Sequence, residues 1–573
     1  MSSSPKSPVF LPKLLTAWRE GYGARELRAD ALAGLTVAIV ALPLAMALAI
    51  ASGAKPETGL LTAIVAGFLI SALGGSRFQI GGPTGAFIPV VYAVIAKYGF
   101  DGLVLATLMA GVMLVAAGLL RVGTLMKYIP QPLVTGFTSG IAVIILASQF
   151  KDLLGLQVAD VPAEFLPKLK VLWQHLGEFN PWAFGLAVGC VALIIGLRRL
   201  SQTAPGFLIA VVAASVLVAA AGIPVDTIGS RFGGIPTSLP APQLPELGWT
   251  RLVELLPAAF TIAFLAGIES LLSAVVADGM SGGKHRSNTE LVAQGVANTA
   301  SALFGGLPAT GAIARTATNI RAGARTPVAG MLHALFLLLF VLVGAKLAAW
   351  VPLPALAGVL VVVAWNMSEH GHFRHVLRSA PRGDRAVLLL TFLLTVFVDL
   401  TLAIQVGMVV AAFVFMYRMS EAVQVGAGLN LVDEDEDADT EAARRTREED
   451  ARQRIGLPRG VEVFRIAGPL FFGAANRLDN LLDRLVPKPR VFILRMRMVP
   501  IIDASGVHAL SNLAERCRRQ GIVLVLSGLQ EQPRKVLAKM GMRQNEGALY
   551  LVRDFDEART VAERLVGTQA GGG

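Results

Sequence analysis

Two charged side chains within apolar sequence are the residues of this chain most able to do chemistry. Glu269 lies deep in the apolar run that starts near Ala259, and Arg315 follows a glycine-rich interruption of another run. A charge inside a membrane segment costs at least about 2.5–3.5 kcal/mol unless it is paired or hydrated, which makes both residues functional candidates. We expect Glu269 to carry a proton or coordinate a cation, and Arg315 to attract an anion.

Each of these residues also has a purely structural interpretation. Arg315 could pair with a carboxylate to close a gap between helices, and Glu269 could form that static ion pair or stay a protonated, hydrogen-bonded acid. Ser273 lies one helical turn beyond Glu269 on the same face, so we group the two as coupling candidates.

Two glycine-rich interruptions share one order of residues, GGPTGA at 81–86 and GGLPATGA at 305–312. Glycine and proline break helices, and two broken segments in corresponding places indicate a substrate site in an inverted-repeat membrane protein. Helix N-termini carry partial positive charge and free N–H groups, which favours an anion. The substrate-binding candidates are Thr84, Gly85, Ala86, Phe87, Thr310, Gly311, Ala312, Ile313, Ala314 and Arg315.

Composition indicates a polytopic membrane protein. Of the 573 residues, 54% are hydrophobic and only 16% are charged, whereas soluble proteins carry about 25% charged residues. Apolar stretches of suitable length give about fourteen segments between Ala31 and Met419. The two motifs fall on about the third and tenth segments, and this odd offset gives the halves opposite orientations. We therefore predict an α-helical domain with a seven-plus-seven inverted repeat.

Basic loops account for the net charge of +11 and predict the orientation, so we expect no nucleic-acid partner. Residues 1–29 have no apolar core, so we expect a cytoplasmic segment without a cleaved signal peptide. Positive charge places both termini in the cytoplasm, with the spans in lipid of the cell inner (plasma) membrane. Loops assigned to the cytoplasm hold Arg77, Arg121, Lys127, Arg198, Arg199, Lys284, Arg286, Arg321, Arg325, Arg374, Arg378, Arg382 and Arg385; the opposite loops hold Lys55, Lys97, Lys151, Lys168, Lys170, Arg231, Arg251 and Lys346.

A soluble α/β domain is expected after the apolar sequence stops near Tyr417. The charged stretch 433–454 is interpreted as a solvated linker. Strands are expected at 461–466, 491–494 and 522–526, with helices at 474–485, 505–520 and 531–540. The predicted domains are 1–29, an N-terminal segment; 30–420, a transmembrane domain; 421–457, a linker; 458–566, the α/β domain; and 567–573, a disordered tail.

Other polar patterns have mainly structural interpretations. Glu290, Gln294 and Asn298 repeat every four residues, which indicates first a hydrogen-bonded seam between helices and only then a cavity lining. Three histidines between 370 and 375 lie in an expected exposed loop without clear metal-ligand geometry. Cys190 and Cys517 fall in different domains, which argues against a disulfide or a cysteine metal site. With no catalytic constellation or P-loop motif, we expect no enzyme activity, metal or cofactor.

The chain resembles the sulfate permease (SulP) family of anion transporters over about residues 30–565. The resemblance is carried by Leu42-Pro43, QIGGPTGAF at 79–87, AGIESLLSAVVADGMSG at 266–282, GGLPATGAIART at 305–316 and GARTPVAG at 323–330. It implies a core and a gate domain, an anion bound between two half-helices, a homodimer and a cytoplasmic STAS domain. Asp503-Ala504-Ser505-Gly506 matches the STAS signature, and Ser505 corresponds to a position phosphorylated in soluble relatives. A helix N-cap is the plainer interpretation of Ser505.

Two departures from the family bear on coupling. Sodium-coupled bicarbonate permeases that resemble this chain carry Asp where Glu269 stands and lack Arg315, which favours a proton over sodium. Leu44 stands where many relatives have a polar residue. We predict a secondary transporter of a sulfate, bicarbonate or dicarboxylate anion that works by elevator-type alternating access. The alternatives are an uncoupled anion exchanger or channel and a membrane-anchored regulatory protein acting through STAS; nucleobase transporters share the plan but lack STAS.

Overall fold

A computed structural model describes residues 10–124, 130–158, 161–200, 205–246, 248–421, 424–427, 457–471 and 488–567. The chain forms two compact units, Met1–Ala411 and Ala412–Gly573. The charged stretch 433–454, the helix expected at 474–485 and the expected tail after Gly567 lie outside the described residues.

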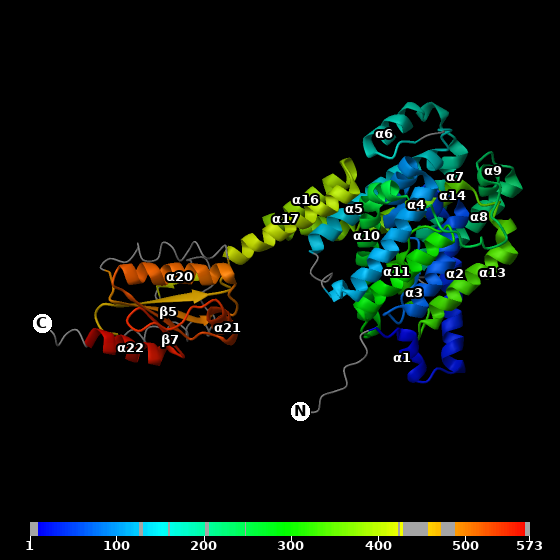
Figure 1. Cartoon of the computed structure of the whole chain (residues 1–573). Coiled ribbons are helices and arrows are strands. Elements are labelled where there is room, and N and C mark those ends of the chain that lie inside the picture. The colour runs from blue at the N-terminus through cyan, green and yellow to red at the C-terminus, as the bar shows by residue number, and fades with distance from the viewer. Residues whose placement is uncertain are drawn as a thin grey trace. The chain divides into compact units, whose positions relative to one another are not determined.

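The first unit is a bundle of helices, as lipid requires, because a helix satisfies its own backbone hydrogen bonds. In Figure 1, α6 and α9 lie at the end of this unit opposite α1. Its helices are α1 Lys13–Arg19, α2 Ala24–Ala51, α3 Pro56–Leu73, η1 Gly85–Phe87, α4 Ile88–Leu119, η2 Val122–Thr124, α5 Gln131–Leu154, α6 Phe165–Gln174, η4 Leu176–Glu178, α7 Pro181–Leu200, α8 Gly206–Ala221, α9 Ile228–Phe232, α10 Trp249–Ser281, α11 Ser287–Leu303, α12 Ile313–Arg321, α13 Val328–Ala348, α14 Leu353–Met367, α15 His370–Ser379 and α16 Arg382–Phe397. Helix α17, Leu400–Glu421, spans the boundary between the two units at Ala411.

Within the described residues, nine helices are long and apolar enough to cross a membrane. One of them, Gly85–Leu119, contains Gly99 at φ +74°, where the helix is interrupted. The shorter helices α8, α11, α12 and α16 have 16, 17, 9 and 16 residues. The count of about fourteen segments therefore stays a prediction.

The helices group by contact into two sets. In one set α4 packs on α10 and α11, while α13 packs on α2 and α3; in the other α5 packs on α14 and α16, and α7 on α8 and α14. A close crossing joins α4 to α11 at Gly111 and Gly295, where a Cβ on Gly295 would lie 2.6 Å from the carbonyl oxygen of Gly111. Small residues allow such close backbone approach between membrane helices.

The basic loop expected around the three histidines is a helix. His370 begins α15, and all three histidines are exposed on it. The apolar Val376 is the buried residue of this helix. Because the segment is short and has one buried position among many charged and polar ones, its sequence shows no helical period of apolar residues.

The second unit contains a five-stranded sheet in the order β3-β4-β5-β6-β7. Strands β4 to β7 are parallel, and β3 pairs antiparallel with β4. The expected α/β architecture is confirmed, but β3, β7 and α22 were not predicted. Its elements are β3 Gln424–Ala427, β4 Val461–Ala467, β5 Val491–Met498, α20 Ala504–Arg519, β6 Val523–Ser527, α21 Glu531–Lys539, β7 Leu549–Val552 and α22 Phe555–Gly567.

Both faces of this sheet are buried, which explains the continuous apolar strands. Along β5, Phe492 and Leu494 pack in the cluster of α20 and α21, while Val491 and Ile493 pack in the cluster of α22. Successive side chains of a strand point to opposite faces, so a strand covered on both sides has no polar alternation.

Asp503, and not Ser505, caps helix α20. The Asp503 side chain accepts a hydrogen bond from the amide of Gly506 at 2.8 Å, and Ser505 is the second residue of the helix. The expectation that Ser505 is the N-cap is therefore wrong, because the N-cap lies two residues earlier and Ser505 is already inside the helix.

Gly295→Ala is expected to lower the thermal unfolding midpoint of the purified protein, because overpacking at such a crossing costs about 1–3 kcal/mol. The matched control is Gly189→Ala on α7, where a new Cβ would meet nothing within 4 Å. There the better helix propensity of alanine, about 0.5–1 kcal/mol, leaves the midpoint unchanged or raised. Equal midpoints for the two variants would contradict this account of the crossing.

Candidate functional site

The two glycine-rich interruptions meet as a two-stranded antiparallel ladder. Strand β1 (Gly81–Gly82) pairs with β2 (Thr310–Gly311), with the two strand ends Gly81 and Gly311 opposite each other. Since a bilayer supplies no water to free backbone groups, each break provides hydrogen-bond partners that the other needs. The fold thus brings the two motifs into one place.

Glycine is required at three positions of this ladder. A Cβ on Gly311 would lie 1.8 Å from Nε2 of Gln79, and one on Gly81 would lie 2.3 Å from Cδ1 of Ile70. Gly82 has φ +151°, a conformation that favours glycine. The shared glycines of the motifs therefore serve close backbone pairing as well as ligand approach.

Ser270 on α10 holds the ladder through its hydroxyl group. This oxygen accepts hydrogen bonds from the amide of Gly311 at 3.0 Å and from Nε2 of Gln79 at 3.2 Å, and it lies 3.2 Å from the Thr310 hydroxyl. Sequence reasoning missed Ser270 and Gln79. In the sequence, Ser270 is a polar residue next to the buried Glu269, and Gln79 is a polar residue just before the first motif. These positions were the available signals.

The two half-helices begin at Thr84 and Ala312. Thr84 is the N-cap of η1 (Gly85–Phe87), which continues into α4, and Ala312 is the N-cap of α12. Thr310 lies two residues before its cap and donates its hydroxyl to the carbonyl of Ala266 at 2.9 Å. The two motif threonines are therefore not equivalent, and Thr310 does not offer the free hydroxyl donor that the motif predicts.

The predicted contact residues differ in exposure. Residues 85–87 are buried, as is Ala312, whose amide donates to the carbonyl of Ile80 at 2.8 Å. Ile313 and Ala314 are exposed, Ile313 by 41%. The accessible side of the break is thus the first turn of α12, where N–H groups have no partner within the helix.

Glu269 is joined to the first half-helix. Its Oε2 accepts a hydrogen bond from the Thr84 hydroxyl at 2.7 Å, and both residues are half-buried. Although both residues are described, Glu269 and Arg315 form no ion pair, so the static pair considered from the sequence is wrong. The carboxylate is held by a neutral donor, and no cation among the described residues contacts it.

Arg315 reaches from α12 across the ladder to the first motif. Its Nη2 donates to the carbonyl of Pro83 at 2.8 Å, and the residue is 2% exposed. Its Nε and Nη1 have no hydrogen-bond partner within the described residues. A buried guanidinium with unsatisfied N–H groups is costly, which makes it a strong attractor for an anion that could satisfy them.

Ser273 positions α12. Its hydroxyl donates to Oγ1 of Thr316 at 3.1 Å, and the same Thr316 oxygen accepts from the amide of Ile80 at 3.1 Å. The contact ties α10 to the second half-helix and to the residue before β1. Its role in coupling stays a prediction, and its direct partner is Thr316.

The polar stripe on α11 forms a hydrogen-bonded seam, as expected. Glu290 accepts from the amides of Gly75 at 2.8 Å and Ser76 at 3.1 Å, and Gln294 donates to Glu290 at 2.9 Å. Asn298 donates to the carbonyl of Ala309 at 2.8 Å and accepts from its amide at 2.8 Å. The partners are mostly backbone groups, so the stripe satisfies the chain on both sides of the ladder.

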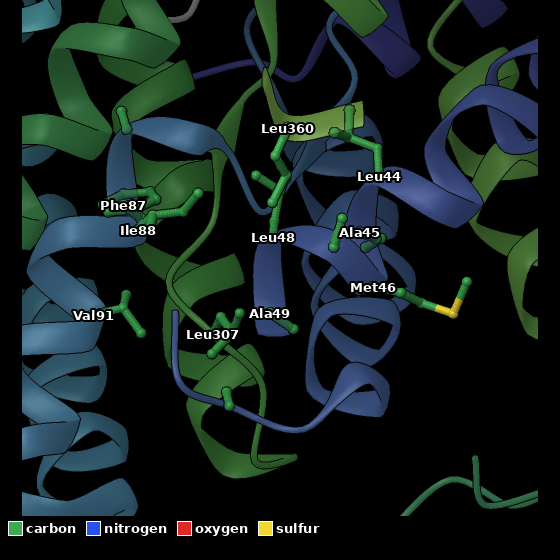
Figure 2. Packing of buried hydrophobic residues seen from close by; sticks show 14 of the residues in the cluster. Leu44, Ala45, Met46, Leu48, Ala49, Phe87, Ile88, Val91, Leu307 and Leu360 are labelled. Carbon is green, nitrogen blue, oxygen red and sulfur yellow. The ribbon is translucent and has the colours of Figure 1, made fainter. Parts of the chain in front are cut away.

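Apolar side chains surround the first half-helix on its other side. A Cβ on Gly85 would lie 3.4 Å from Ile145 on α5, 3.5 Å from Met367 and 3.7 Å from Val363 on α14. Figure 2 shows the buried cluster that continues from there, in which Leu360 of α14 lies close to residues of α2, including Leu44. Leu44 thus contributes an apolar contact here.

Comparisons with known proteins identify the family of this chain. Residues 27–391 match the model of the "Sulfate permease family", and residues 456–555 match the STAS domain. The chain is 43% identical to the "Putative sulfate transporter YvdB" of Bacillus subtilis over 94% of this chain and 98% of that protein. It is 30% identical to the "Bicarbonate transporter BicA" of Picosynechococcus sp., over 90% of this chain and 91% of that protein.

Solved structures share the fold. The transmembrane domain of a cyanobacterial bicarbonate transporter, BicA, matches with a TM-score of 0.60 and 32% identity, covering 68% of this chain and 98% of that one. The murine Solute Carrier 26 family member A9 anion transporter matches with a TM-score of 0.83 and 16% identity, covering 98% and 97% of the two chains. The chain belongs to the sulfate permease (SulP) family of anion transporters and carries a STAS domain.

Proposed function

We propose that this protein is a secondary active transporter of a small oxyanion, coupled to protons through Glu269 and bound at the ladder between the two half-helices. The observation that carries the proposal is Arg315, a buried guanidinium with two unpaired nitrogens beside the broken helices. Sulfate, bicarbonate and dicarboxylates all present oxygens to such a site, and relatives named for sulfate and bicarbonate support the first two.

Electrostatics favour an anion at this place. Each helix start contributes about half a positive charge and free N–H groups, and Arg315 adds a full charge in a site with little water to screen it. The first turn of α12, with the exposed Ile313 and Ala314, provides the approach. The bound oxyanion would accept hydrogen bonds from the backbone and from Nε or Nη1 of Arg315.

Glu269 is the proposed proton carrier. Its carboxylate contacts the Thr84 hydroxyl at the start of the first half-helix, so its charge is felt by an anion bound at that start. A negative Glu269 disfavours the anion, whereas a protonated Glu269 removes this repulsion. Proton and anion binding would then support each other, as symport requires.

The proposed movement is a displacement of one helix set against the other. The ladder is held by α10 and α11, which belong to the set with α2, α3, α4 and α13, while α5 and α14 contact the first half-helix through apolar side chains. Such contacts have no directional bonds, so they favour sliding. This division supports an elevator-type mechanism with α5, α7, α8, α14 and α16 as the gate.

The end of the unit that holds α1 is proposed to face the cytoplasm of the inner membrane. Many basic residues lie in the loops at this end, among them Arg286, which donates to the carbonyl of Leu11 before α1. The STAS domain would lie on the same side. Within it, a phosphate on Ser505 would sit in the first turn of α20, where a helix favours negative charge, which supports a regulatory role. A homodimer stays an expectation from the family.

Glu269→Gln is expected to abolish the dependence of uptake on an inward proton gradient, because the amide keeps an acceptor for Thr84 but cannot carry the proton. Uptake of labelled sulfate and bicarbonate into proteoliposomes, with and without the gradient, measures this. Glu254→Gln on the exposed part of the same helix is the control and should behave as wild type. A gradient dependence that survives in Glu269→Gln would remove the residue from coupling and favour an uncoupled exchanger.

Arg315→Ala is expected to raise the apparent KM for the anion about tenfold or more, since a hydrogen bond to a charged group contributes about 1.5–3 kcal/mol. The thermal midpoint should change little, because loss of the Pro83 contact is offset by relief of a buried charge. Arg321→Ala, at the exposed end of the same helix, is the matched control. An unchanged KM in Arg315→Ala with normal folding would exclude Arg315 from the site.

Single-cysteine labelling is expected to place Lys170→Cys outside and Arg374→Cys inside, because α6 and α15 lie at the two proposed faces. An impermeant maleimide applied to intact cells should label the first variant and should label the second only after permeabilisation. The native Cys190 and Cys517 are buried, and burial raises the pKa of the Cys517 thiol to about 12, so background labelling is low. The reverse labelling pattern would invert the proposed orientation.

A further inference from the structure

A second polar cavity lies at the end of the transport unit opposite α1. It has a volume of about 340 Å³ and is enclosed by α2, α4, α5, α6, α9 and α14. Along α14 it is lined by residues from Leu353 to Leu360, whereas the first half-helix faces Val363 and Met367. Since a helix rises 1.5 Å per residue, the middle of the cavity lies about 13 Å along α14 from the residues that face the first half-helix. The cavity is therefore separate from the site at the ladder.

Lys168 of α6 supplies this cavity with a buried charge. The residue is 3% exposed and lines the cavity, with its ammonium group 5.1 Å from the ring centroid of Tyr92 on α4. Among the described residues no hydrogen-bond acceptor or carboxylate contacts this nitrogen. The ammonium group therefore faces the cavity with an aromatic ring as its protein contact, and an anion there could act as its counter-charge.

The other cations of the cavity already have partners. Arg231 binds Asp152 at 2.7 Å and Asp226 at 3.1 Å, and Lys151 donates to the carbonyl of Val158. Among the described residues, Lys168 is thus the cation of this cavity that has neither a salt bridge nor a hydrogen bond to a protein acceptor. An anion bound in the cavity would supply that contact.

The scaffold around Lys168 is anchored. The Tyr92 hydroxyl donates to the carbonyl of Val161 at 2.5 Å, which fixes the ring beneath α6. The Phe165 ring packs edge-on against Phe397 of α16 at 5.7 Å. An ammonium held at a fixed place in a cavity of this size is preorganised for a small ligand.

We propose that this cavity is an outer anion-binding subsite, in which the Lys168 ammonium binds the oxyanion before it reaches the site at the ladder. The inference rests on the proposed function, because it takes its ligand to be the transported anion. On the proposed orientation the subsite faces away from the cytoplasm. Leu360 lines this cavity and belongs with Leu48 to the buried apolar cluster that also contains Phe87 and Ile88 of the first half-helix (Figure 2).

Acetylation of Lys168 in the purified full-length protein tests the subsite directly. Burial lowers the pKa of Lys168 to about 8, so at pH 8 much of the amine is neutral and reactive. A bound anion stabilises the ammonium and, by raising the pKa by one unit, cuts the neutral fraction at pH 8 about fivefold. Brief treatment with acetic anhydride and mass spectrometry would measure this. The exposed Lys170 on the same helix is the internal control.

Sulfate or bicarbonate is expected to slow acetylation of Lys168 saturably, while Lys170 is unaffected and gluconate at equal ionic strength protects neither. The same protection is expected in Arg315→Ala, in which binding at the ladder is impaired. Protection without uptake of any anion would refute the proposed function and leave the subsite standing. Uptake without protection, or equal protection of both lysines, would overturn the subsite.

Transport kinetics give a second test. Lys168→Met is expected to raise the KM for uptake from the α6 side about tenfold, equivalent to about 1.4 kcal/mol, while Lys168→Arg restores it and the exposed Lys170→Met changes nothing. The wild-type KM should also rise above pH 8 as the ammonium loses its proton, and this rise should be absent in Lys168→Met. Identical KM values and pH profiles for Lys168→Met and wild type would overturn the proposal. The titratable and charged groups that face Lys168 are Tyr92 on α4, Lys151 and Asp152 on α5, Glu164 before α6 and Arg231 on α9.

Discussion

Backbone pairing between β1 and β2 is the interaction on which the transport unit depends. Two helices that stop within a bilayer expose N–H and C=O groups that lipid cannot satisfy, and the cost of each such group is several kcal/mol. The ladder satisfies one break with the other. The close approach of the two backbones explains why glycines are needed there. Ser270 and Asn298 accept hydrogen bonds from backbone amides that the two short strands do not pair.

The same pairing concentrates positive charge. Because each strand is only two residues long, the half-helices that follow them start close together, and Arg315 reaches from the second to the carbonyl of Pro83 before the first. Glu269 contacts the opposite start through Thr84. Glu269 and Arg315 therefore both contact the first break but form no ion pair with each other. A ligand can bind between them.

The sequence predicted those features that follow from residue type and spacing along the chain. Glycine and proline marked both breaks, and apolar length marked most helices. The strands of the STAS domain followed from their apolar character. It could not predict that Thr310 would turn toward Ala266, because the motifs share Thr-Gly-Ala while the second half-helix starts two residues later in its motif, with Ala312 as its cap. Ser270 was missed because a lone serine in an apolar run resembles ordinary packing.

Other features were unpredictable because they depend on contacts between distant segments. In the sequence, Lys168 resembles the other loop lysines. Its burial depends on the packing of α6 over Tyr92, a contact between distant segments. The capping of α20 depended on a two-residue difference in where the helix begins, and helix ends are commonly placed with an error of one or two residues. Helix α15 resembled a loop because its charged residues left one buried position.

The ladder also has a consequence for biogenesis. Strand β1 emerges from the ribosome long before β2, and at about 5–20 residues per second the interval between Gly82 and Thr310 lasts roughly ten to fifty seconds. Throughout that time the first break has no backbone partner. The nascent first half must therefore wait within a polar environment, such as the insertion machinery, until the second half arrives in the opposite topology and closes it.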